Sequence, residues 1–211
     1  MSELRTNRIV PRDGLTSGTN NGGGIIQVRN IMYTDVFSSN HSNSGYVDVT
    51  GFNLNITPTR SDSKILVSAE VAGGLNSNYG YNFRFRVVKT PSGISGQTDQ
   101  AIGIAASGAY AMTGGYNLYQ TDSSTPYIFG MSKTFMDSPA TTDTINYRIQ
   151  VSHSHSSSGA IVYVNRRGSS SAWTAISTLT LMEVKEYHNE IYSHRGTSSI
   201  KTNRRVAYGR H

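Results

Sequence analysis

The amino-acid sequence predicts an all-β protein folded as a β-sandwich. Charged residues make up only 15% of the 211 residues, whereas Gly, Ser, Thr and Asn are abundant, and this balance favours turns and strands over helices. Several segments alternate apolar and polar residues, and clusters of Gly, Pro, Asp and Asn separate them. An apolar content of 36% is enough for one core, so we expect one main domain over residues 25–184.

The chain begins with an arm or linker, residues 1–24, in which charges and a Gly and Asn cluster show no sustained period. From Ile25 the pattern changes, because IIQVRNIMYTDVF is apolar at both odd and even positions. This pattern is typical of a strand that is covered on both faces. We therefore expect such a strand over residues 25–37.

Two further strands are predicted over residues 46–72. In GYVDVTGFNLNITP the apolar positions change phase at Thr50 and Gly51, and a β-bulge with Gly at the extra position would restore the inward direction. The segment PTRSDS then turns the chain, and KILVSAEVA alternates again. Its inward residues are predicted to be Ile65, Val67, Ala69 and Val71. We expect the two strands to pair as a hairpin.

The cleanest alternation in the sequence is YGYNFRFRV, residues 79–87. It predicts one buried face and one solvent-exposed face, with Arg84 and Arg86 directed to solvent or to a partner. The buried face would consist of Tyr79, Tyr81, Phe83, Phe85 and Val87.

Residues 127–151 predict a long hairpin near the end of the β-region. YIFGMSKTFM and INYRIQV each place alternate apolar residues inward, and DSPATTDT between them supplies turn residues. A short strand at Gln100, the segment AIVYVN, and TAISTLTLMEV near Val184 bring the total to about nine strands. This number is usual for a sandwich or jelly roll.

The sequence contains no motif of a known catalytic centre. There is no Walker loop, dinucleotide Gly fingerprint, HExxH, GxSxG or EF-hand loop. The chain has no cysteine, which excludes disulfides, thiolate zinc sites and thiol nucleophiles. The carboxylates are scattered without a recognisable catalytic spacing. We therefore expect no enzyme activity and no cofactor.

His153 and His155, in VSHSHSSSG, are a candidate metal-binding pair. Residues two apart on a strand point the same way, so both imidazoles would continue the stripe of Ile149 and Val151. If three chains met around an axis there, their histidines could supply six nitrogens to one octahedral transition-metal ion. The alternative is a strand end that simply carries two exposed histidines.

The charge balance and the hydropathy of the chain bear on its partners. The net charge is +6 and the pI is about 9.6, but the basic residues are spread along the chain, so we expect a solvated surface and not a nucleic-acid site. No run of eighteen apolar residues occurs, and the N-terminus lacks the apolar core of a secretory signal. We therefore expect a soluble chain, made in the cytoplasm, without membrane insertion.

Several sequence blocks occur in a distinctive order along nearly the whole β-region. They are MSELRTNRI, YVDVTGFNLNITPTRSDSKILV, FMDSPATTDTINYRIQV, VYVNRRG and STLTLMEV. In this order and spacing the sequence resembles the short tail-fibre-like and virion appendage proteins of tailed bacteriophages, especially those of marine hosts. The resemblance implies a virion structural protein, located in the virion, whose domain is similar to the trimeric jelly rolls of the C1q and tumour-necrosis-factor type.

The expected partners are other copies of this chain and other virion proteins. Strands that are apolar at both odd and even positions have more apolar surface than one small monomer can bury, so we expect a homotrimer. Arms at both ends, residues 1–24 and the basic extension 185–211, would dock the domain to the particle, although a solvated tail is an equal alternative. The candidate docking residues are Arg5, Arg8, Arg12, Arg195, Lys201, Arg204, Arg205 and Arg210.

The segment 107–124 is rich in Tyr, Gly and Ser and is the candidate receptor-binding region, with a host surface glycan as one partner to consider. Its candidate contacts are Tyr110, Tyr116 and Tyr119. Three alternatives to a tail fibre or adsorption appendage stay open: a capsid decoration or head-fibre protein, a carbohydrate-active module that binds or cleaves a glycan, and a nucleic-acid-binding protein.

Overall fold

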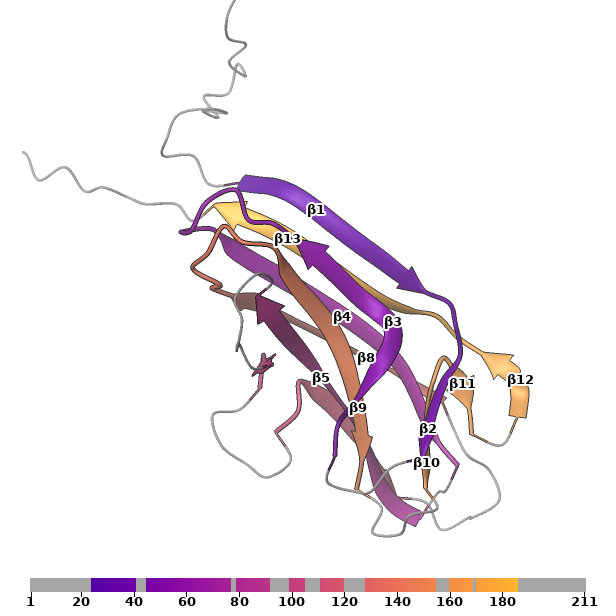
Figure 1. Cartoon of the computed structure of the whole chain (residues 1–211). Coiled ribbons are helices and arrows are strands. Elements are labelled where there is room, and N and C mark those ends of the chain that lie inside the picture. The colour runs from indigo at the N-terminus through magenta and orange to yellow at the C-terminus, as the bar shows by residue number, and fades with distance from the viewer. Residues whose placement is uncertain are drawn as a thin grey trace, which may run out of the picture.

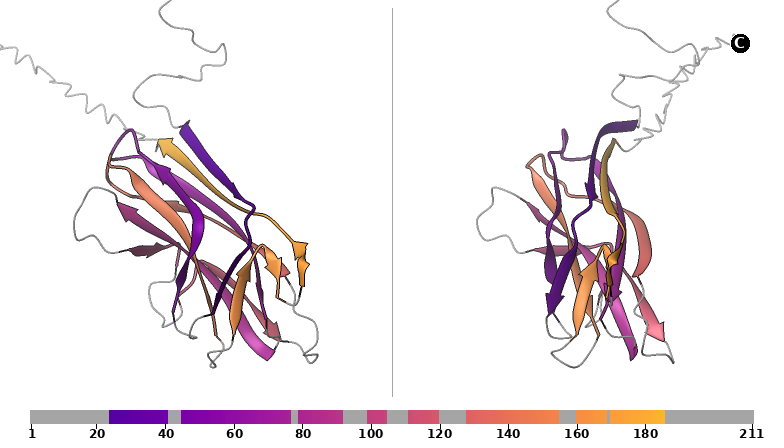
Figure 2. Two further views of the ribbon diagram at one scale, coloured as in Figure 1. Left: turned by 45° about the vertical axis from the view of Figure 1, so that its right-hand side comes forward. Right: turned by 90° about the vertical axis from the view of Figure 1, so that its right-hand side faces the viewer.

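The structure, a computed structural model, describes residues 24–40, 45–76, 79–91, 99–104, 111–119, 128–154, 160–168 and 170–185. Most of these residues belong to strands of two antiparallel sheets, which pack face to face as two layers (Figure 1, Figure 2).

The first sheet, which we call sheet A, has four long strands. In spatial order they are β1 (Gly24–Tyr33), β13 (Ser177–Lys185), β4 (Lys64–Leu75) and β8 (Ile128–Asp137). Two short strands, β10 (Ile161–Val164) and β2 (Phe37–Asn40), continue the sheet beside the C-terminal end of β4.

The second sheet, sheet B, is built around β5. In spatial order it contains β3 (Val47–Ile56), β9 (Ile145–His153) and β5 (Tyr79–Pro91). The other side of β5 pairs with β7 (Gly114–Tyr119) and β6 (Gln100–Ile102). A separate ribbon of β11 (Arg166–Arg167) and β12 (Ser170–Thr174) lies beside the sandwich (Figure 1).

The strand pairing identifies the sandwich as a jelly roll. If the eight principal strands are taken in chain order (β1, β3, β4, β5, β7, β8, β9, β13), the first pairs with the last, the second with the seventh, the third with the sixth and the fourth with the fifth. This nested pairing is that of a long hairpin rolled into two sheets. The predicted fold class is confirmed, with thirteen strands in the described residues instead of about nine because short strands flank the principal ones.

Two predicted hairpins are wrong, because the strands that follow one another in the sequence lie in different sheets. In the described residues β3 pairs with β9 and not with β4, and β8 pairs with β4 and not with β9. Turn residues such as Pro58 end a strand, but they do not determine whether the next strand returns beside it or crosses to the other layer. The predicted strand over residues 25–37 is also divided, since β1 ends at Tyr33 and β2 begins at Phe37.

The predicted β-bulge in β3 is confirmed. The register of β3 on β9 shifts between Asp48 and Asn53, and Gly51 in this interval has a φ of 81°. Such a positive φ is accessible to glycine at little cost. Because of the bulge, Val49 before it and Phe52 after it both point into the core.

The core fills the space between the two sheets. All four inward residues predicted for β4, Ile65, Val67, Ala69 and Val71, are 0% exposed, and they face the aromatic and aliphatic stripe of sheet B. Gly73 of β4 stands on the same inward side as these four residues, and a Cβ at this position would lie 2.1 Å from Cζ of Phe83. Glycine at this position therefore allows the Phe83 ring to pack against the backbone of sheet A.

A buried ion pair joins the two layers at one end of the core. Lys89 of β5 places its Nζ 2.8 Å from Oδ1 of Asp137 at the end of β8, and Tyr147 of β9 donates from its hydroxyl to Oδ2 of the same carboxylate at 2.7 Å. Burial, and then the nearby Asp137 charge, raise the pKa of Tyr147. Lys89 Nζ also lies 2.9 Å from Oδ2, and a carboxylate with these three contacts is well compensated for its burial.

The outward direction predicted for Arg84 in β5 is only half right. The residue is on the outer side of sheet B, but it is 2% exposed, and its guanidinium Nη2 donates to the backbone oxygen of His153 on the neighbouring strand. Arg86 is partly exposed, as expected, and its Nε donates to Oε1 of Gln150 at 2.7 Å. The alternation of the sequence predicts on which side of a strand a residue lies, but it does not predict whether other residues cover that side.

Candidate interaction surfaces

The outer face of sheet A carries a row of apolar side chains that crosses four strands. Val28 of β1, Met182 of β13, Leu66 of β4 and Met136 of β8 are successive partners in the register of the sheet. Val28 is 53% exposed and Met136 is 51% exposed, and the two residues between them are half-buried by their neighbours. We call these four residues the apolar row.

Apolar residues border the row on one side and polar residues border it on the other. Ile25, 61% exposed, lies beside Val184 at the end of the sheet from which the chain termini leave (Figure 1). On the opposite side, Asn30 donates to Oγ1 of Thr180 at 2.7 Å within a rung of polar residues. A contiguous apolar patch with a polar boundary is the usual appearance of a protein interface.

The edge strand β1 contributes much of this exposed surface. In the described residues it pairs only with β13, and its side chains are mostly exposed. The prediction that this strand is covered on both faces is therefore wrong within one chain, although the apolar residues that suggested it, Ile26 and Met32 among them, are present on the surface. The described residues do not supply the cover that the pattern predicts for this strand.

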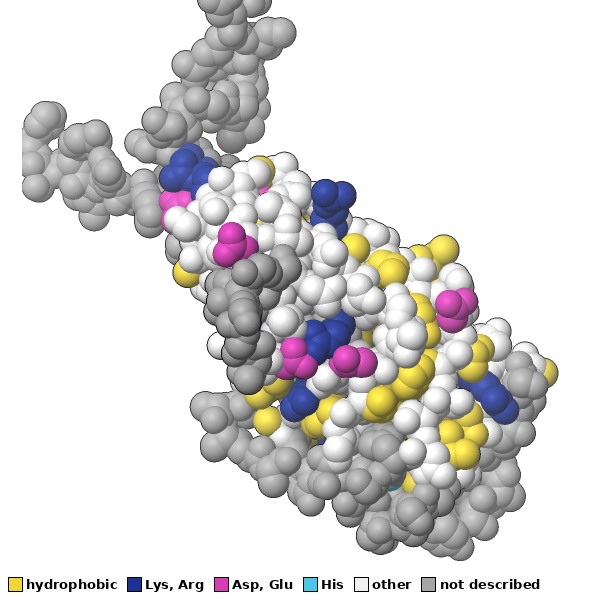
Figure 3. Space-filling view, in the orientation of Figure 1, with side chains coloured by type: hydrophobic (Ala, Val, Ile, Leu, Met, Phe, Trp, Pro, Cys, Tyr) yellow, Lys and Arg dark blue, Asp and Glu magenta, His cyan; other side chains and the backbone are white. Residues whose placement is uncertain are grey.

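The outer face of sheet B is polar and its side chains bind one another. Oδ1 of Asp48 accepts a hydrogen bond from Nε of Arg148 at 3.0 Å and another from Nε2 of Gln150 at 2.6 Å. Arg148 also donates to Asp99 and, at 2.5 Å, to Oγ1 of Thr90. We call these residues, with Arg86 bonded to Gln150, the polar network; charged side chains gather over this face in Figure 3.

The polar network influences the protonation of its members. The hydrogen bond from Arg148, and then that from Thr90, lower the pKa of Asp99. Burial opposes the charge of Arg148, but its bonds to Asp99 and Asp48 outweigh this effect and raise its pKa. Both ions therefore stay charged over a wider pH range than they would alone.

Tyr46 fixes the segment before β7 onto the outer face of sheet B. The Arg86 guanidinium lies 4.1 Å from the centre of the Tyr46 ring, and the Tyr46 hydroxyl donates to the backbone oxygen of Ala111 at 3.0 Å. Burial raises the pKa of Tyr46, although Arg84 and Arg86 act in the opposite direction. The neutral hydroxyl thus holds Ala111 and the following Met112 over the sheet.

The three predicted receptor-contact tyrosines are placed unequally. Tyr110 and the side chain of Tyr119 lie outside the described residues. Tyr116 faces the sandwich interior: its ring stacks on Phe83 with centres 5.6 Å apart, and its hydroxyl donates to the backbone oxygen of Gly73 at 2.9 Å. Burial raises its pKa. The predicted role of the three tyrosines as receptor contacts stays a prediction.

His153 continues the inward stripe of β9, as predicted, and is 0% exposed. A metal ion shared between chains would need this imidazole at the surface, so the burial disfavours that site. His155 lies outside the described residues, and no cluster of three or more potential metal ligands occurs in the described ones. The shared metal site stays a prediction.

The predicted docking arms also remain predictions. Arg5, Arg8, Arg12 and all five basic candidates of the C-terminal extension lie outside the described residues, and the proposed domain boundaries stay predictions as well. The described part of the chain includes no helix with the length and apolarity needed to cross a bilayer.

Comparison with known proteins gives no family assignment. A scan against protein-family models and a search of curated proteins both find no match. Among solved structures, the chain is similar to the infectious bursal disease virus Gx strain structure, with 16% identity and a TM-score of 0.36 over 85% of this chain and 41% of that chain. The VP2 subviral particle of the same virus gives 16% identity and a TM-score of 0.35 over 87% and 42%.

The chain spans less than half the length of either viral chain. TM-scores of this size fall short of a shared fold, so the jelly roll is assigned from the strand pairing and not from these likenesses.

Sequence patterns contained a signal for one of the two surfaces. Residues 25–37 are apolar at both odd and even positions, and Val28 of the apolar row is one of them. This excess indicated an apolar surface on β1, whereas Leu66 and Met182 stand among polar outward residues such as Ser68 and Thr180 and were not indicated. The polar network had no such signal, because Asp48, Asp99 and Arg148 come from three distant parts of the sequence and meet only through the register of sheet B.

Proposed function

We propose that this chain is a non-enzymatic virion structural protein of a tailed bacteriophage, part of a tail fibre or adsorption appendage, which assembles as a homotrimer. The sequence blocks that resemble phage appendage proteins support the virion part of the proposal. The apolar row on the outer face of sheet A supports the self-association, and it is the observation that carries the proposal.

The apolar row suits contact with other copies of the chain. Its four side chains lie in line across the whole width of the sheet, so one flat surface can cover them together. Covering Val28 and Met136, each about half exposed, removes apolar area from water at roughly 25 cal/mol per Å². The polar rung beside the row, with Asn30 and Thr180, would form the rim of the interface.

The terminal arms and the location on the particle belong to the same proposal. β1 begins and β13 ends at the same end of the sandwich (Figure 1). The segments 1–23 and 186–211 therefore both start from this end, and their basic residues would bind carboxylates of neighbouring virion proteins there.

The self-association is tested by the absolute mass of the purified full chain in light scattering. We expect about three times 23.0 kDa for the natural sequence and about one times 23.0 kDa for Met182→Lys, because the substitution would place an unpaired charge inside the interface. Asn53→Lys, on the outer face of sheet B, is the matched control and should keep the trimer mass. A natural chain that has the mass of one subunit would contradict the homotrimer.

The location is tested by labelling purified virions with an antibody against the folded domain and locating the label by electron microscopy. Label at the tail or its fibres supports the appendage. Label distributed over the shell would replace it with the capsid decoration or head-fibre protein, and unlabelled particles would contradict the virion assignment.

A further inference from the structure

The edge of sheet A that β1 forms is long and regular. Among the described residues β1 pairs only with β13, so one side of its backbone has no strand beside it (Figure 1). The pairing with β13 shifts once, between Ile25 and Gln27, and then continues without interruption from Gln27 to Tyr33. An uninterrupted edge of this kind is a template for pairing with another strand.

The other edges of the two sheets are less open to such pairing. In sheet B, the bulge at Gly51 interrupts β3, and on the opposite side β6 and β7 contain only 3 and 6 residues. In sheet A, β2 has 4 residues, and β8 carries the exposed Lys133 near its middle. Short strands, bulges and lysines are means by which natural sheets prevent edge pairing. The run Gln27–Tyr33 contains one charge, that of Arg29, and neither a bulge nor a lysine.

The polarity of this run is symmetric about Asn30. Val28 and Met32 stand two residues before and after Asn30 on the outer face of sheet A, and they are 53% and 58% exposed. If two copies of the run pair antiparallel with Asn30 opposite Asn30, Val28 of each copy lies opposite Met32 of the other. A shift of this register by two residues in either direction places an apolar side chain opposite Asn30, and a shift by one residue exchanges the two faces. One register therefore matches apolar with apolar and polar with polar.

The inner side of the run is compatible with the same register. Ile31, which is half-buried, lies opposite Arg29 of the other copy, and the aliphatic part of that arginine can cover it. The two Arg29 guanidinium groups stand diagonally on one side of the paired strands and repel each other. Salt screens this repulsion, so we expect the pairing to be stronger at high salt.

We propose that β1 of one copy pairs antiparallel with β1 of a second copy about a two-fold axis at Asn30, so that sheet A continues from one chain into the other. Such a contact is self-complementary, since each pair of opposite residues occurs twice.

The contact goes beyond the proposed homotrimer, because it uses the backbone edge of sheet A and not its outer face, and it would join one trimer to another. A contact limited to one strand buries little surface. We therefore expect it at high local concentration, as on a particle, while the mass of the dilute chain in light scattering stays unchanged.

The test is disulfide trapping in the full-length chain, which has no cysteine of its own. Asn30→Cys would place two thiols opposite each other with their Cα atoms about 4.5 to 5.5 Å apart, a separation that suits a disulfide. The matched control is Asn53→Cys on the outer face of sheet B, since the side chains of both asparagines are exposed and bond to a neighbouring strand. In a glutathione redox buffer we expect about tenfold more linked pair from Asn30→Cys, because the contact raises the effective thiol concentration.

Two further cysteine variants test the register. In the proposed pairing, the two thiols of Val28→Cys lie about 13 Å apart along the strands, as do those of Met32→Cys, so neither variant should link to itself. A mixture of the two variants should link, because Val28 lies opposite Met32. Each experiment is repeated with Met182→Lys added, which removes the contact through the outer face of sheet A. Thermal unfolding shows that each variant is folded.

Two outcomes would overturn the inference. If Asn30→Cys gives no more linked pair than Asn53→Cys at high protein concentration, the β1 edges do not pair. If Val28→Cys links to itself as readily as it links to Met32→Cys, the two-fold axis is not at Asn30. Neither outcome affects the proposed homotrimer, which the light-scattering mass decides separately.

Discussion

The outer faces of the two sheets differ in how far they complete their own interactions. On sheet B, Asp48, Gln150 and Arg148 bind one another, so each charge already has a partner within the chain. On sheet A, the apolar row lies in water, and the described residues offer nothing that covers it. Both surfaces are outer faces of antiparallel sheets, and they differ in the residues that point outward.

This difference shows which face gains by association. A network of charges that is satisfied in water loses hydration when another protein covers it, and the gain from new contacts is small. Covering the apolar row with a complementary surface is favourable, because apolar side chains are removed from water and lose no hydrogen bonds to it. We therefore expect sheet A to determine assembly, and sheet B to remain exposed to solvent.

The largest expected effect comes from breaking the support beneath sheet A. Glu183 points inward from β13 between Met182 and Val184, is 0% exposed, and accepts hydrogen bonds from the backbone N–H and the hydroxyl of Thr59, each at 2.8 Å. Gln27 of β1 also donates to it, at 2.6 Å. Glu183→Ala removes a fully buried carboxylate together with its three hydrogen bonds and leaves a cavity in its place, and we expect a loss of about 3 kcal/mol in the free energy of unfolding.

Urea denaturation measures this loss, and Glu183→Gln is the control. The amide keeps the shape and one acceptor oxygen, so we expect a smaller loss of about 1 to 2 kcal/mol. Because Gln27 connects β1 to this carboxylate, Glu183→Ala should also weaken the trimer in light scattering. Equal stability of the Ala and Gln variants would show that the carboxylate does not support sheet A.

A second, smaller effect is expected from breaking the polar network of sheet B. Arg148→Ala removes the cation that Asp48 and Asp99 share, and because both carboxylates are about half exposed we expect a loss of about 1 kcal/mol in the free energy of unfolding. The trimer mass should not change, because the network lies on the other face. Arg148→Lys should recover only part of the stability, since an ammonium group lacks the planar fork that reaches Asp48, Asp99 and Thr90 together. A monomeric but stable Arg148→Ala chain would reverse the roles assigned to the two faces.

Much of the fold could be predicted from local pattern, because local pattern determines which side of a strand faces the core. The alternation in β4 gave its four core residues, and the phase change at Gly51 gave the bulge in β3. Pairing could not be predicted in the same way. The connections from β3 to β4 and from β8 to β9 have ordinary turn residues, yet both cross between layers, since the partner of a strand depends on the whole roll.

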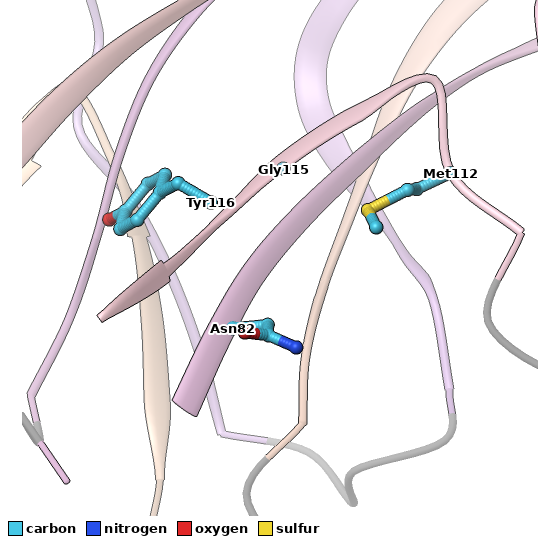
Figure 4. A pocket seen from close by; sticks show the side chains of 4 residues that line it. All are labelled: Asn82, Met112, Gly115 and Tyr116. Atoms are coloured by element: carbon cyan, nitrogen blue, oxygen red, sulfur yellow. The ribbon is translucent and has the colours of Figure 1, made fainter. Parts of the chain in front are cut away.

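The surfaces show the same limit. Two-sided apolar strands indicated that sheet A would have exposed apolar residues, but the alignment of Val28, Met182, Leu66 and Met136 requires the register of four strands. The small cavity lined by Asn82, Met112, Gly115 and Tyr116 (Figure 4) could not be predicted, because it depends on the missing Cβ of Gly115 beside Met112. Tyr116 was selected from composition, and composition does not distinguish a presented ring from a packed one.

The smallest expected effect sharpens the comparison through pH. Hydrogen bonds from Arg148 and Thr90 hold the pKa of Asp99 below its usual 3.8. A carboxyl with a lowered folded-state pKa contributes stability above its unfolded pKa, and this contribution disappears as the pH falls through the folded value. The natural chain should therefore exceed Asp99→Asn in stability near neutral pH, by less than about 1 kcal/mol because Asp99 is about half exposed. The two chains should converge in stability as the pH falls through the lowered folded-state pKa of Asp99.

Urea denaturation of both chains from neutral to acidic pH measures this difference in stability. Hydrogen bonds also lower the pKa of Glu183, but both chains contain Glu183, so its contribution to the pH dependence is the same in each. The row on sheet A contains no titratable side chain, so the variant should keep the trimer mass at neutral pH. A stability difference that stays constant with pH would mean that Asp99 acts through its shape and not its charge, in which case the network on sheet B would be held by the bonds to Asp48 alone.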